Sequence, residues 1–275
     1  MRAAVVGHVE WIEFGRVDHV PEPGEIIHVT ESWQAPGGGG AVTAVQLLKL
    51  AGDAMFYTAL GDDELGHRAK RELEELGLRV HAAFRPEPQR RAFVHVDSDG
   101  ERTITVVGDR LGPRADDPLP WEELDETDAV YFTAGDAGAV REARRTGTLV
   151  ATARGVETVA EAAVRLDALV ASSRDAGERY EEGDLDPPPD RVVRTASSRG
   201  GEFETRAGER GSWEATPAPG PVSDVYGCGD SFAGGLTFGL GSGLPVAEAV
   251  ELGARCGAAC ATGRAPFGGQ LRPGD

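Results

Sequence analysis

The first third of the chain contains short apolar runs of two kinds. A β-branched run at 3–9 is typical of a buried strand, and the segments 14–20 and 25–30, separated by Pro-Glu-Pro-Gly, predict two more strands. A nearly continuous apolar run predicts a buried helix over 41–51, which Gly52 ends, followed by a strand over 54–60. Asp62 and Asp63 then precede apolar residues at helical spacing up to Gly77, which predicts an amphipathic helix.

The remainder of the chain alternates between strand and helix patterns. Apolar runs at 91–96 and 102–107 flank an Asp-Ser-Asp-Gly turn and predict a hairpin. From residue 128 onward, predicted strands (129–133, 149–152, 168–171, 191–195) alternate with predicted helices (137–145, 158–166, 175–182). A second hairpin (202–205 with 212–215) and two helices (229–240 and 245–262) follow. This order predicts an α/β fold with parallel βαβ units, and the early strands and first hairpin could form a separate small sheet.

Composition narrows the class of protein. The 275 residues fit one large domain, or one domain with a small appendage. The 28 Lys and Arg against 46 Asp and Glu give a net charge of −18, which argues against nucleic-acid binding because phosphate backbones require clustered cations. No apolar run is long enough to span a membrane, no signal-peptide pattern opens the chain, and three cysteines do not suggest a disulfide framework. We therefore expect a cytoplasmic protein.

The segment Gly227-Cys228-Gly229-Asp230 is the strongest candidate for chemistry. It lies between a proline-rich stretch and an apolar helical run at 232–240. Glycines here would let backbone N–H groups converge at the start of a helix, where a phosphate could be held without lysine. Asp230 could then accept a proton from a nearby hydroxyl. The same residues could also simply turn the chain and cap the helix.

The wider segment 224–235, Asp-Val-Tyr-Gly-Cys-Gly-Asp-Ser-Phe-Ala-Gly-Gly, resembles the C-terminal signature of the ribokinase-like, or PfkB, carbohydrate kinases. The usual form of that signature is Asp-Thr-x-Gly-Ala-Gly-Asp-x-Phe. The resemblance implies a three-layer α/β/α sandwich with a mostly parallel central sheet and a small β-sheet lid. It implies a single domain over 1–275, with lid strands from about 14–30 and 91–107. The exposed edge of a small lid sheet could also pair with a second copy of the chain, which would give a homodimer formed through the lid.

The resemblance also implies an activity, transfer of the γ-phosphoryl group of ATP to a hydroxyl of a small sugar or sugar-like substrate. Asp230 would be the catalytic base, and Gly227, Cys228 and Gly229 would form the anion hole. Asp224 stands where many family members bind a monovalent cation such as K⁺, although Val225 replaces the usual Thr beside it. Two alternatives stay open: a nucleoside kinase, and a ligand-binding protein that has lost activity on the same fold.

Further residues are assigned to substrate and nucleotide by the same resemblance. The substrate side would comprise Glu10, Arg102, the glycine motif and the position of its usual Asn, here valine: Gly37, Gly38, Gly39, Gly40 and Val42. The nucleotide side would comprise the loop residues Thr195, Ser197 and Gly200, and the last helix with Cys256 and Cys260. Asp175 occupies the acidic position of an Asn-x-x-Glu motif that organises Mg²⁺, and could equally cap a helix.

Overall fold

The computed structural model describes residues 1–264 and 266–274, and its centre is a mixed sheet of nine strands. Across the sheet the order is β13 (Arg210–Trp213), β12 (Gly201–Thr205), β11 (Arg191–Thr195), β10 (Ala168–Ser172), β9 (Thr148–Thr152), β8 (Ala129–Phe132), β1 (Ala3–Val6), β4 (Ala54–Gly61) and β5 (Arg79–Arg85). All neighbours from β5 to β11 pair in parallel, and the pairs β11–β12 and β12–β13 are antiparallel. The predicted mostly parallel sheet is confirmed.

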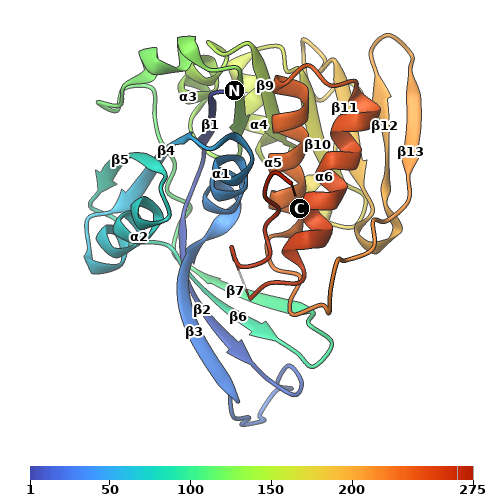
Figure 1. Ribbon diagram of the computed structural model, residues 1–275. Coiled ribbons are helices and arrows are strands. Elements are labelled where there is room, and N and C mark those ends of the chain that lie inside the picture. Colours follow the sequence, from blue (N-terminus) through green and yellow to red (C-terminus); the bar gives the residue numbers. More distant parts are fainter. Residues whose placement is uncertain (265, 275) are drawn as a thin grey trace.

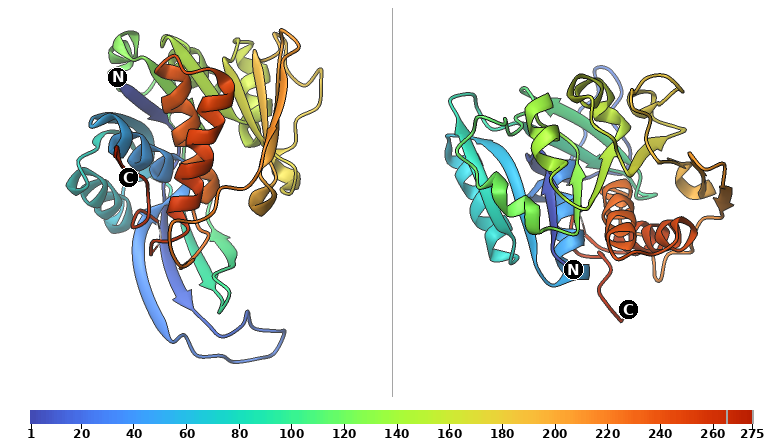
Figure 2. Two further views of the ribbon diagram at one scale, coloured as in Figure 1. Left: turned by 45° about the vertical axis from the view of Figure 1, so that its right-hand side comes forward. Right: turned by 90° about the horizontal axis from the view of Figure 1, so that it is seen from above.

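Helices cover both faces of this sheet (Figure 1; Figure 2, right). Strand β1 shows why: Ala3 and Val5 belong to a core shared with helices α1 (Gly38–Ala51), α5 (Cys228–Gly241) and α6 (Val246–Cys260). Ala4 and Val6 point the other way, into a second core with α3 (Ala137–Ala143) and α4 (Val156–Ala162). Helix α2 (Glu64–Glu75) packs on β4 and β5. The three-layer α/β/α sandwich is therefore confirmed.

A second sheet of four strands, called the lid here, extends from one end of the body (Figures 1 and 2). Its order is β3 (Glu31–Gly37), β2 (Glu10–Arg16), β6 (Arg91–Val96) and β7 (Arg102–Val107). The hairpin β6–β7 matches its predicted bounds. The first two strands do not: they begin at residues 10 and 31, whereas the sequence predicts 14–20 and 25–30.

The second of these errors has a clear physical cause. Residues 25–30 lie in the loop that joins β2 to β3, and the side chain of Ile26 is 89% exposed. Strand β3 contains polar residues and Pro36, so its sequence lacks the alternation of apolar and polar residues that predicts a strand. Pro36 is tolerated because β3 lies at the sheet edge and pairs only with β2.

Three further elements differ from the sequence prediction. Strand β5 is missed altogether by the apolar pattern. Helix α4 ends at Ala162 rather than near residue 166, because Ala163 adopts a left-handed conformation with φ of 53°. The predicted helix over 175–182 is only a short 3₁₀ turn, η3 (Ala176–Glu178), whose first N–H groups are capped by the Asp175 side chain.

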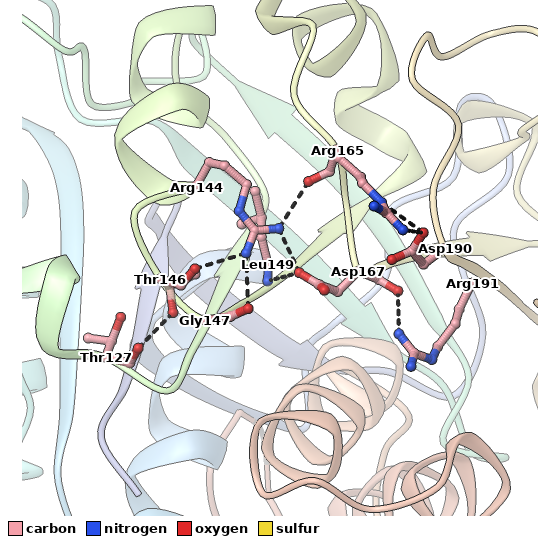
Figure 3. Close-up of polar contacts among 9 residues, drawn as sticks. All are labelled: Thr127, Arg144, Thr146, Gly147, Leu149, Arg165, Asp167, Asp190 and Arg191. Carbon is pink, nitrogen blue, oxygen red and sulfur yellow. Dashed lines mark hydrogen bonds and ion pairs between the residues drawn. The ribbon is translucent and has the colours of Figure 1, made fainter. Parts of the chain in front are cut away.

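A network of hydrogen bonds and ion pairs joins the amino ends of strands β8, β9, β10 and β11 (Figure 3). The Arg144 guanidinium donates to the Asp167 carboxylate (2.6 Å) and to the carbonyls of Arg165, Thr146 and Gly147. Asp167 also accepts the N–H of Leu149 on β9 (2.8 Å). This end of the sheet is thus tied together by hydrogen bonds, and the carboxyl ends of the strands lie at the lid side. Among the described helices, none combines the length and apolar character needed to cross a bilayer.

Candidate active site

The amino end of α5 presents backbone donors that no side chain caps. Gly227 is the N-cap and adopts φ of 78°, a left-handed conformation that favours glycine. The first turn of a helix leaves its N–H groups without intrahelical partners, and a Cβ on Gly229 would meet nothing within 4 Å. The carboxylate of Asp230 forms no hydrogen bond or salt bridge within the described chain. Asp230 therefore does not cap the helix, and this helix start is open to an anion.

A second glycine-rich helix start lies directly against Asp230. A Cβ added to Gly39 would lie 2.9 Å from Asp230 Oδ1 and 3.3 Å from Thr133 Oγ1. The two helices are held together by Thr43 of α1, whose hydroxyl donates to the Asp230 carbonyl (3.0 Å). Gly38, with φ of 83°, donates its N–H to the Tyr226 hydroxyl (2.8 Å). Any side chain at Gly39 would crowd the carboxylate, so the close approach of this turn to Asp230 requires glycine.

The environment of Asp230 alters its ionisation. Burial is the largest cause and raises the pKa of this carboxyl to about 7, with the negative charge of Glu178 adding to the effect and Arg102 opposing it. A carboxyl with this pKa can take up and release a proton near neutral pH. The carboxyl of Asp230 thus lies at the open start of α5 and changes its charge near neutral pH.

A cavity of about 960 Å³ opens in front of Asp230, between the lid and the carboxyl ends of the parallel strands. It brings together twelve residues that the sequence singles out: Glu10, Gly38, Gly39, Arg102, Asp175, Thr195, Ser197, Gly200, Gly227, Cys228, Gly229 and Asp230. Strands β8, β9 and β10 add Thr133, Thr152 and Ser172 at or just after their carboxyl ends. The predicted substrate and nucleotide sides therefore share one cavity.

Three residues assigned to the substrate side do not line this cavity. Val42 is fully buried and lies beneath Gly227. A Cβ added to Gly227 would lie 2.9 Å from Cγ1 of Val42. Gly37 and Gly40 are packed too closely for a side chain. A Cβ on Gly37 would lie 2.5 Å from Ile12 Cδ1, and a Cβ on Gly40 would lie 2.6 Å from the carbonyl oxygen of His8. These residues shape the site from behind, which corrects their predicted contact with substrate.

The two cysteines of α6 also point away from the cavity. The cavity face of this helix carries Ala254, Gly257, Ala258 and Ala261. Cys256 is fully buried in a cluster with Leu50 and Leu271, and Cys260 is directed at the carbonyl of Tyr226 (3.5 Å). Helical spacing separates these two sets of positions onto different faces. The prediction that Cys256 and Cys260 contact the nucleotide is therefore corrected.

The two predicted metal ligands lie in different settings. Asp224 is buried, and its carboxylate accepts the N–H of Tyr226 (3.0 Å). Asp175 lines the cavity but is paired with Arg154, which also donates to Glu178 (3.0 Å). Over residues 1–264 and 266–274, no group of three or more His, Cys, Asp or Glu side chains is arranged to hold a metal ion. The described residues thus offer no assembled metal site.

The sequence does not assign several charged residues that the fold brings to this cavity. They are His8, Arg90, Arg110, Arg154 and Glu178. Four of them share a position next to the end of a strand. His8 follows β1, Arg154 follows β9, and Arg90 and Arg110 lie on either side of the hairpin β6–β7. A residue at the carboxyl end of a parallel strand is a candidate ligand contact whatever motif surrounds it.

An open helix start, a glycine turn against a half-buried carboxylate and a small sheet beside one cavity are features that an α/β phosphotransferase requires. The chain belongs to the pfkB family of carbohydrate kinases, whose family model matches residues 2–176 and 188–266. It is similar to the ATP-dependent ribose-1-phosphate kinase of Halopiger xanaduensis, with 30% identity over 280 residues covering 94% of this chain and 91% of the relative.

Solved structures show the same fold. The ribokinase of Thermotoga maritima superposes with a TM-score of 0.75 at 22% identity, covering 96% of this chain and 94% of that one. The ribokinase of Arabidopsis thaliana, solved with ribose and ATP, gives a TM-score of 0.73 at 19% identity, covering 98% and 95%. This chain is accordingly a carbohydrate kinase with the ribokinase fold.

Proposed function

We propose that the protein transfers the γ-phosphoryl group of ATP to a hydroxyl of a small sugar, with Asp230 as the general base. The single observation that carries this proposal is the contact between Asp230 and Gly39, where a Cβ would lie 2.9 Å from Oδ1. A sugar hydroxyl held against this turn would be within hydrogen-bond reach of the carboxylate.

The proposed reaction uses two features of the α5 amino end. Asp230 accepts the hydroxyl proton as the hydroxyl oxygen forms its bond to the γ-phosphorus. The bond from that phosphorus to the oxygen bridging the β- and γ-phosphates breaks, and ADP leaves. The N–H groups of the anion hole, at Gly227, Cys228 and Gly229, stabilise the charge on the transferring group without any side-chain cation.

The raised pKa of Asp230 also favours an active kinase over an inactive ligand-binding protein. Holding a carboxyl in an environment that raises its pKa to about 7 costs folding free energy whenever the group is ionised. A protein that only binds sugar gains nothing from a proton acceptor beside an open helix start. Removal of water under the lid would further favour transfer to the sugar over hydrolysis of ATP.

Other features expected from the resemblance stay predictions. They are Mg²⁺ at Asp175, a monovalent cation at Asp224, a cytoplasmic location and a homodimer formed through the lid. The edge strands β3 and β7 supply unpaired backbone groups to which a second copy could bind.

The acceptor can be identified by measuring ADP release with MgATP and a panel of candidates. The names of the relatives suggest ribose-1-phosphate, ribose and fructose, and adenosine tests the nucleoside alternative. The Asp230→Asn variant serves as the control for contaminating ATPase. Acceptor-dependent ADP release that is absent from the variant supports the proposal. Release that does not depend on any acceptor, or that the variant retains in full, contradicts it.

A further inference from the structure

Arginines gather in the cavity of a protein whose net charge is −18. Five line it: Arg90, Arg102, Arg110, Arg154 and Arg174. Acidic side chains outnumber basic ones by 46 to 28 along the chain, whereas the cavity lining holds as many acidic residues as arginines: Glu10, Glu101, Asp175, Glu178 and Asp230. The cavity is therefore less acidic than the chain as a whole, and an arginine there that lacks a carboxylate partner can bind an anionic ligand.

Only some of these arginines already have a carboxylate partner. Arg90 donates to Glu10 (2.8 Å), and Arg154 is bound by Asp175 and Glu178. Arg110, by contrast, forms neither a hydrogen bond nor a salt bridge within residues 1–264 and 266–274. It lies on the segment that leads from the end of β7 back to the body, where Leu111 is buried. Its backbone is thus anchored while its charge stays free for a ligand.

Three of the arginines line the same cavity as one buried histidine and act on its charge. His8 is 5% exposed, lines the cavity and has no hydrogen-bond partner for Nδ1. Burial lowers its pKa well below the usual value, and the charges of Arg110, Arg90 and Arg154 lower it further. The pKa of Arg110 is lowered as well, first by burial and then by Arg90 and Arg154. Cations that repel one another in this way would be relieved by an anion bound among them.

The glycine turn relates this group to Asp230. Gly39 meets the Asp230 carboxylate, while its neighbours Gly38 and Gly40 meet His8, with a Cβ on Gly38 lying 3.2 Å from His8 Cδ2. Arg110, Thr133 and Arg154 also line a second, adjoining cavity of about 420 Å³. A sugar lying along the turn would therefore have one end at Asp230 and its other end near the arginines.

We propose that Arg110, with Arg154 and His8 beside it, forms a second anion site that binds a phosphate already carried by the acceptor sugar. This proposal rests on the kinase function proposed above and specifies the substrate class: a sugar phosphate with a free hydroxyl at the end distant from its phosphate. The site is distinct from the anion hole at Gly227–Gly229, which holds the phosphates of the nucleotide. The product would be a sugar bisphosphate.

The test is a calorimetric titration of the full chain without nucleotide, using ribose-1-phosphate, ribose and ribonate as probes. The wild-type protein should bind ribose-1-phosphate at least tenfold more tightly than ribose or the sugar acid ribonate. Arg110→Ala should lose most of that preference, and Arg110→Lys should keep part of it because the charge remains without the planar donor geometry. Arg71→Ala, which removes an exposed arginine of α2 that lines neither cavity, should bind like wild type.

Steady-state measurements supply a second readout. With ribose-1-phosphate as acceptor, Arg110→Ala should raise KM tenfold or more and change kcat little, since in this proposal the residue binds the phosphate of the acceptor and not the transferring group. Equal affinity of wild type for ribose and ribose-1-phosphate, equal or tighter binding of ribonate, or unchanged binding in a folded Arg110→Ala would overturn the proposal. Tight, Arg110-dependent binding of ribose-1-phosphate without any ATP turnover would instead refute the kinase function and leave the anion site standing.

Discussion

Replacing Asp230 with Asn should make the protein more stable at alkaline pH. In the folded protein the pKa of this carboxyl is about 7, against 3.8 for an ordinary Asp. The folded state therefore holds the proton more tightly than the unfolded chain. The contribution of this group to the stability of the wild-type protein is then greatest below pH 4, declines as the pH rises from 4 to 7, and reaches its lower plateau above pH 7. Asn carries no charge and avoids this decline.

The size of the effect follows from the same pKa difference. At about 1.4 kcal/mol for each tenfold change in proton affinity, the full difference corresponds to about 4 kcal/mol at pH 8. The carboxyl is partly open to the cavity, where solvent screens its charge, so we expect roughly half of this, about 2 kcal/mol.

Urea unfolding at pH 5 and pH 8 measures the effect. The free energy of unfolding of Asp230→Asn should exceed that of wild type by about 1–2 kcal/mol more at pH 8 than at pH 5. Asp18→Asn, at an exposed position of the lid loop, is the matched control and should show the same difference from wild type at both pH values. If the Asp230 variant behaves like this control, the carboxyl is not held in an environment that disfavours its charge.

Three other substitutions test the geometry of the site and its support. Gly39→Ala would place a methyl group 2.9 Å from the Asp230 carboxylate, and kcat/KM for the acceptor should fall about 100-fold while ATP affinity measured by calorimetry is unchanged. Val42→Ala should destabilise the protein by about 1–2 kcal/mol in urea unfolding and leave the acceptor KM unchanged; a raised KM without lost stability would restore Val42 to the substrate site. Asp117→Ala removes both 2.6 Å contacts with the half-buried Arg85 guanidinium and should cost about 3 kcal/mol; a loss below 1 kcal/mol would show that the pair is solvated.

The parts of the fold that the sequence predicts correctly depend on local patterns. The hairpin β6–β7 is predicted because an Asp-Ser-Asp-Gly turn lies between its two apolar runs. The residues at 224–235 follow one another in the chain, so the glycines of the anion hole and Asp230 could be assigned together. Strand β3 could not be predicted in this way. It pairs with β2 across a long loop, and a polar strand at the edge of a sheet carries no periodic pattern of apolar residues.

The site was only partly predictable for a similar reason. Cys256 and Cys260 lie in the helix that borders the cavity, but which face of that helix is turned inward depends on packing against α1 and α5. Arg110 and Arg154 belong to no motif, and only the fold brings them beside His8. Residues recruited from distant strand ends determine the charge of the cavity, and no short pattern in the chain predicts them.

The role of Asp230 as the base of an ATP-dependent sugar kinase is tested most directly by measuring phosphoryl transfer and nucleotide affinity on the same Asp230→Asn preparation. Phosphorus NMR of reactions with MgATP and the best acceptor of the panel identifies the products. Wild type should yield ADP and a newly phosphorylated sugar. The variant should bind ATP with wild-type affinity and transfer at least 1000-fold more slowly, about 4 kcal/mol in the barrier. Transfer within a factor of ten of wild type would contradict the account.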